Sequence, residues 1–171
     1  MLTKGSMLIV IFVITATGKI TAQKPGNYAE VNGLKMYYEI HGQGKPLVLL
    51  HGAFNTINLA FGQLIPELSK NHKVIAVELQ GHGRTADIDR PFSFESMADD
   101  VATLLKHLKT DSADICGYSM GGAVALQVAI RHPQVIRKMI VISAAFNMKA
   151  GHRKPGLFCP RSLRKCLKVH P

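Results

Sequence analysis

The stretch ICGYSMGGAVAL, residues 115–126, places Ser119 where an apolar run gives way to a helical pattern. Within it, Gly117 and Gly121 flank the serine in the pattern Gly-x-Ser-x-Gly. When a strand turns sharply into a helix, the serine backbone is strained, and side chains two positions away on either side would clash. The turn lifts the hydroxyl above a sheet and directs the Met120 N–H towards an oxyanion formed beside it. The stretch therefore predicts a nucleophilic serine at a strand-to-helix turn.

Short apolar runs alternate with helical patterns on both sides of this stretch, after a hairpin that turns at Asn32-Gly33. Runs such as PLVLL are typical of parallel strands that are buried on both faces. The pattern predicts an α/β fold, with a mostly parallel sheet and flanking helices on both faces. We expect strands at 28–31, 34–40, 46–50, 73–79, 113–118 and 135–143, and helices at 59–69, 94–108 and 121–131.

Two further loops follow predicted strand ends, LLHGAF at 49–54 and ELQGHGRT at 78–85. Because the carboxyl ends of parallel strands meet at one edge of a sheet, we expect both loops to lie near the serine. The backbone N–H of Ala53 is a candidate second oxyanion donor, since Gly52 allows a close approach. We interpret His51 as a structural residue and His82 as a turn residue that packs under the rim of the site.

These three motifs, in this order, resemble the α/β-hydrolase superfamily, in particular its esterase, lactonase and cofactor-free haloperoxidase-like members. The resemblance runs from about Tyr28 to Phe146 and implies that Ser119 is the nucleophile, with Ala53 and Met120 as backbone oxyanion donors. It also implies attack on an ester, thioester or lactone of a small-molecule substrate through an acyl-enzyme, with no metal or organic cofactor. A serine rather than an aspartate at the turn disfavours the epoxide hydrolase and haloalkane dehalogenase branches.

The family's remaining triad members are not evident, because they follow the serine in the order acid and then histidine. Asp114 is the last acidic residue of the chain, and the later histidines, His132, His152 and His170, do not follow predicted strands. We expect the chain to lack the cap and the last two strands of the fold. Without a base, turnover falls by roughly 10⁶.

The sequence changes character near its end, where residues 150–171 carry six basic residues and no acid. We expect the hydrolase domain to span 23–147 and a basic irregular tail to span 148–171. One hypothesis is that this tail is read out of frame from a longer hydrolase. An alternative is a short, non-catalytic protein that binds a ligand or partner, and a less favoured one is a tail that binds acidic lipid or nucleic acid.

Residues 1–22 are typical of a signal peptide, with Lys4 ahead of an apolar core that is too short to span a membrane. Export to a periplasm or beyond follows from that prediction. The formal net charge of +10 lies mainly at the two ends, since residues 23–149 contribute only +2. A nucleic-acid-binding face on the folded domain is therefore not indicated. Cys116 falls in a predicted buried strand and is expected to be a core residue.

Overall fold

The computed structural model describes residues 26–144, which form one six-stranded sheet in the order β1-β2-β4-β3-β5-β6. The first two strands form an antiparallel hairpin, β2 pairs antiparallel with β4, and the other neighbours pair in parallel. The predicted α/β class with a mostly parallel sheet is confirmed. The strands are β1 (Asn27–Val31), β2 (Leu34–His41), β3 (Lys45–Leu50), β4 (His72–Val77), β5 (Ala113–Tyr118) and β6 (Ile136–Ile142).

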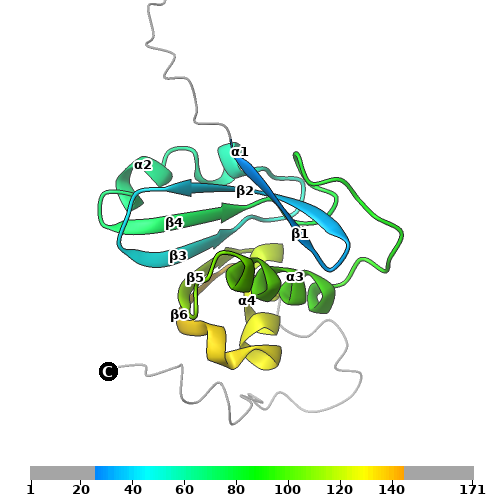
Figure 1. Cartoon of the computed structure of the whole chain (residues 1–171). Coiled ribbons are helices and arrows are strands. Elements are labelled where there is room, and N and C mark those ends of the chain that lie inside the picture. Colours follow the sequence, from blue (N-terminus) through cyan, green and yellow to red (C-terminus); the bar gives the residue numbers. More distant parts are fainter. Residues whose placement is uncertain (1–25, 145–171) are drawn as a thin grey trace, which may run out of the picture.

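Helices cover both faces of this sheet, as the apolar runs predict (Figure 1). In β3, Leu47 and Leu49 point into a smaller core beneath α1 and α2, whereas Val48 and Leu50 point into a larger core beneath α3 and α4. All four side chains are buried. The helices are α1 (Ile57–Phe61), α2 (Ile65–Leu68), α3 (Phe94–His107) and α4 (Met120–Arg131), followed by the 3₁₀ turn η1 (Pro133–Val135).

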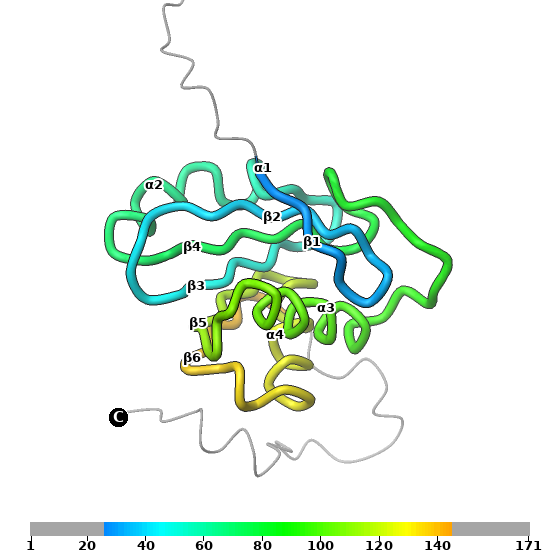
Figure 2. The backbone as a smooth tube through the Cα atoms, viewed as in Figure 1, coloured from blue at the N-terminus to red at the C-terminus, as the bar shows by residue number. Residues whose placement is uncertain are grey.

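The turn between β1 and β2 has the predicted Asn-Gly geometry, with φ of 50° at Asn32 and 81° at Gly33. The tip of the hairpin lies beside α3 (Figure 2). Asn32 Nδ2 donates a hydrogen bond of 2.9 Å to the buried Asp100 Oδ1 on α3, and Arg90 forms an ion pair with the same carboxylate. These bonds join the hairpin, the loop before α3 and the helix into one unit.

The prediction of one continuous helix over 59–69 is wrong, because the segment forms the two short helices α1 and α2. Gly62 follows the last residue of α1, and Pro66 lies in the first turn of α2. A proline has no N–H to donate and its ring clashes with the carbonyl four residues earlier, so a helix cannot run through this position unbroken. The predicted signal peptide, 1–22, and the predicted tail, 148–171, lie outside the described residues.

Candidate active site

Ser119 lies between the end of β5 and the first residue of α4, with φ of 51° and ψ of −114°. This left-handed backbone is strained for a residue with a side chain, and it persists only where surrounding contacts fix it. The Ser119 N–H donates to Ile142 O at 2.8 Å, and its carbonyl accepts from Gly122 N and Ala123 N at 3.0 and 3.1 Å. The turn at Ser119 is therefore held on one side by β6 and on the other by α4.

Both glycines of the motif are required by backbone contacts. A Cβ on Gly117 would lie 2.2 Å from Gly121 O, and a Cβ on Gly121 would lie 2.1 Å from Leu50 O. No side-chain adjustment can relieve either clash, since the opposing atoms belong to the main chain. The steric reason predicted for the Gly-x-Ser-x-Gly pattern is confirmed, and it brings the start of α4 against the end of β3.

The loop after β3 packs directly against the serine. A Cβ on Gly52 would lie 3.0 Å from the Tyr118 ring and 3.4 Å from Ser119 Cβ. The neighbouring His51 is fully buried, and both of its ring nitrogens bind backbone: Nδ1 lies 2.7 Å from Gly52 O, and Nε2 lies 3.2 Å from Leu79 N. Because Leu79 N–H is a donor, Nε2 is the unprotonated nitrogen and Nδ1 carries the proton. Burial lowers the pKa of His51, which keeps the ring neutral.

This arrangement gives His51 a specific structural role. A trans peptide holds its C=O and N–H in one plane and in opposite directions. Because His51 binds the carbonyl of Gly52, the N–H of Ala53 in the same peptide points away from the histidine. Ala53 and Met120, the two predicted oxyanion donors, line one cavity of about 500 Å³. The interpretation of His51 as structural agrees with these contacts, since neither ring nitrogen is free to accept a proton.

A buried ion pair that the sequence analysis missed lies beneath the loop after β4. The Glu78 carboxylate is fully buried and accepts from Arg84 N at 2.5 Å, from the Arg84 guanidinium at 2.7 and 3.0 Å, and from Ile57 N at 3.3 Å. Burial by itself would raise the pKa of Glu78, but the hydrogen bonds and charge of Arg84 bring it below its usual value. Arg84 also lies over the Tyr37 ring, at 3.8 Å from its centroid. A glutamate directly after an apolar strand, with an arginine six residues later, was the available signal.

The described histidines do not supply a base for Ser119. His82 Nδ1 lies 2.8 Å from Gln80 O, and its ring packs on His51 with centroids 5.1 Å apart. His132 caps the far end of α4, about 18 Å along the helix from its start, and its Nε2 lies 2.6 Å from Asp99 Oδ1. No hydrogen bond joins Ser119 Oγ to a histidine among residues 26–144. His152 and His170 lie outside that range.

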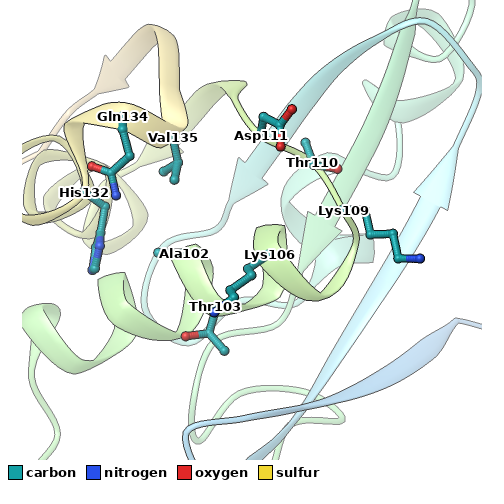
Figure 3. A pocket seen from close by; sticks show the side chains of 9 residues that line it. All are labelled: Ala102, Thr103, Lys106, Lys109, Thr110, Asp111, His132, Gln134 and Val135. Carbon is teal, nitrogen blue, oxygen red and sulfur yellow. The ribbon is translucent and has the colours of Figure 1, made fainter.

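A second cavity, of about 370 Å³, lies away from the serine at the carboxyl ends of α3 and α4. Lys106 and Thr103 approach it from α3, and His132 and Gln134 approach it from the segment after α4 (Figure 3). Cations at a helix carboxyl end offset the helix dipole, which accounts for the lysines there. Within residues 26–144, no group of three metal-ligating side chains could hold an ion, and no helix is long and apolar enough to cross a membrane.

Comparison with known proteins identifies the family of this chain. Residues 45–158 match the family described as alpha/beta hydrolase fold. The chain belongs to this family. The match continues beyond residue 147, where the composition changes. Among curated relatives, the dihydrolipoyllysine-residue acetyltransferase component of the acetoin cleaving system of Pseudomonas putida is 38% identical over 75% of this chain and 35% of its own length. A soluble epoxide hydrolase of a Corynebacterium species is 33% identical over 74% of this chain and 44% of its own.

Solved structures show the same fold. The epoxide hydrolase CorEH has a TM-score of 0.71 and 32% identity over 77% of this chain and 46% of its own. Est816, described as an N-acyl homoserine lactone degrading enzyme, has a TM-score of 0.63 and 35% identity over 68% of this chain and 45% of its own. The chain thus spans less than half the length of these four relatives. Since they differ in reaction, similarity alone indicates a hydrolase and does not select the bond that is cleaved.

Proposed function

We propose that this chain carries the nucleophile half of a serine hydrolase site that acts on ester, thioester or lactone bonds. The observation that carries the proposal is the strained Ser119 turn beside a cavity that Ala53 and Met120 both line. A hydroxyl nucleophile in such a turn is suited to attack on a carbonyl carbon, and two backbone N–H groups are suited to the oxyanion.

In the proposed reaction, Ser119 Oγ forms a bond to the carbonyl carbon while a base removes its proton. The negative charge passes to the carbonyl oxygen, which accepts hydrogen bonds from the N–H groups of Ala53 and Met120. Collapse of this intermediate breaks the bond to the alcohol, thiol or ring oxygen, which leaves with a proton. Water then attacks the acyl-enzyme by the same steps, releasing the acid and restoring the serine.

The base and its carboxylate are the parts that residues 26–144 do not bring to Ser119. Residues 120–171 contain no Asp or Glu, so a carboxylate following the serine is lacking in the printed sequence. We therefore propose that the 171-residue chain, assayed alone, acylates slowly and turns over about 10⁶-fold below a complete triad.

We also propose export, from the signal-like residues 1–22. Amino-terminal sequencing of the secreted protein tests that, and an intact Met1 in the cytoplasm would contradict it.

The nucleophile is tested by exposing the chain to a p-nitrophenyl ester with imidazole supplied as an external base, since imidazole is the chemistry a histidine would provide. Peptide mass spectrometry should find the acyl group on Ser119 and lose it in Ser119→Ala. Ser69→Ala is the matched control, because Ser69 precedes β4 and so lies at the opposite edge of the sheet. Acylation that persists in Ser119→Ala, or never reaches Ser119 with imidazole present, refutes the proposal.

A further inference from the structure

The cavity that Ala53 and Met120 line is mostly apolar at its described residues. None of these residues is Asp, Glu, Lys or Arg, and His82 is the one titratable side chain among them. Thr56 uses its hydroxyl to cap α1, accepting from Leu59 N at 3.3 Å. The lining consists of Ala53, Phe54, Asn55, Thr56, Gly81, His82, Gly83, Phe92 and Met120.

Two aromatic rings of this lining are exposed. Phe54 is 98% exposed, and its backbone has a left-handed φ of 57°, which is unfavourable for a residue with a side chain. Phe92 is 53% exposed, and its ring lies 6.2 Å from that of His82 between centroids. A ligand that enters the cavity removes part of the surface of these rings from water, so they favour an apolar ligand.

The surrounding charges are already satisfied or oppose an anion. Beneath Gly83, the Glu78 carboxylate is paired with Arg84. Beside Gly81, Asp87 accepts from Gln80 Nε2 at 2.6 Å, which leaves a negative charge close to the rim. A ligand with its own carboxylate would bury that charge with no lysine or arginine of the described lining to pair with it, which is costly.

We propose that the substrate is an uncharged, largely apolar carbonyl compound whose apolar part lies against Phe54 and Phe92. This inference rests on the proposed function for its carbonyl, which would face Ala53 and Met120. The volume of about 500 Å³ lies within the range of small-molecule sites. The ring pair sets the apolar preference, and the lack of a lysine or arginine among the described lining residues sets the discrimination against acids.

The test measures binding rather than turnover, so it stands whether or not Ser119 reacts. Amides have the shape of esters but resist hydrolysis, so the full chain is titrated with butyramide, hexanamide, adipamic acid and 6-aminohexanamide and followed by backbone amide NMR. Two added methylenes should improve binding by up to about 15-fold, since burying each one is worth about fourfold. Hexanamide should bind at least about 10-fold more tightly than adipamic acid, and more tightly than 6-aminohexanamide by a smaller factor, because Asp87 attracts the ammonium of the latter.

Phe54→Ala and Phe92→Ala should each weaken hexanamide binding by about 5-fold or more. Ile130→Ala is the matched control, since Ile130 is an exposed apolar residue of α4 outside the cavity lining, 42% accessible. Equal binding of neutral and charged analogues, no dependence on chain length, or phenylalanine variants that match Ile130→Ala would each overturn the inference. A failure of Ser119 acylation with these binding results intact would refute the proposed function alone.

Discussion

Replacing Glu78 with glutamine removes one charge from a buried ion pair and changes little else in volume. The carboxylate is fully buried and receives four N–H donors, three from Arg84 and one from Ile57. A glutamine keeps one acceptor oxygen, but its amide group turns two donors towards the Arg84 donors. The substitution therefore leaves a repulsive contact and removes one of the two carboxylates paired with Arg84, the other being Glu39, at 3.2 Å.

The expected loss of unfolding free energy depends on how exposed the Glu78 and Arg84 side chains are. Removing one partner of a fully buried pair costs about 3–5 kcal/mol. The Arg84 side chain is 37% exposed, so water can solvate part of its charge, and we expect a loss of about 2–3 kcal/mol of unfolding free energy at neutral pH. Glu67→Gln is the matched control, because Glu67 pairs with Lys70 at the surface and is 70% exposed. That change should cost less than about 0.5 kcal/mol.

The pH dependence gives the prediction a sign. The folded pKa of Glu78 lies below its usual value of about 4.3, so its contribution is complete above that value and is lost as pH falls through the folded pKa. Urea unfolding of the wild type and both variants at neutral and acid pH measures the effect. The difference between wild type and Glu78→Gln should shrink on acidification. A neutral-pH loss no greater than that of Glu67→Gln, or a difference that grows towards acid pH, would refute the reasoning.

Three further predictions concern the elements around the serine. Gly121→Ala should lower the unfolding free energy by about 3 kcal/mol or more, because the new Cβ would clash with backbone. Gly33→Ala should lower it by only about 1–2 kcal/mol, because its φ of 81° is strained but nothing lies near the new Cβ. Thermal unfolding compares the two variants, and equal losses would contradict the clash. Burial lowers the pKa of His51, so below about pH 6.5 the unfolded state gains a proton that the folded state does not. The fall in Tm on acidification should therefore be smaller in His51→Gln, and an identical fall would exclude this cause. Burial raises the pKa of the Cys116 thiol, so iodoacetamide should label its peptide more slowly in buffer than in urea by mass spectrometry; equal rates would show an accessible thiolate.

The fold could be predicted where the pattern of apolar residues reflects their burial. In PLVLL, every position is apolar because alternate residues enter the cores above and below the sheet, and the structure separates Leu47 from Val48 in that way. Asn32-Gly33 encodes its turn through the φ values that these residues tolerate. Residues 59–69 misled the prediction, because their apolar spacing suits one helix while Pro66 limits where a helix can begin.

Only the part of the site that depends on local steric contacts could be predicted from the sequence. Gly117 and Gly121 indicate the turn, because main-chain contacts exclude a Cβ at both positions. The partners of His51 could not be read from its motif, since Leu79 N reaches the ring only after β4 is placed beside β3. The pairing of Glu78 with Arg84 likewise depends on the path of a loop, which charge patterns alone do not specify.

The bond from Ser119 N–H to Ile142 O sets an order of events during synthesis. The turn at Ser119 is encoded locally, but its strained backbone is completed by the last residue of β6, which leaves the ribosome later. A nascent chain that has produced α4 but not β6 therefore has the motif without the backbone bond that fixes the Ser119 turn. If Ser119 is the proposed nucleophile, its covalent labelling in stalled chains would report when β5 pairs with β6 at the edge of the sheet.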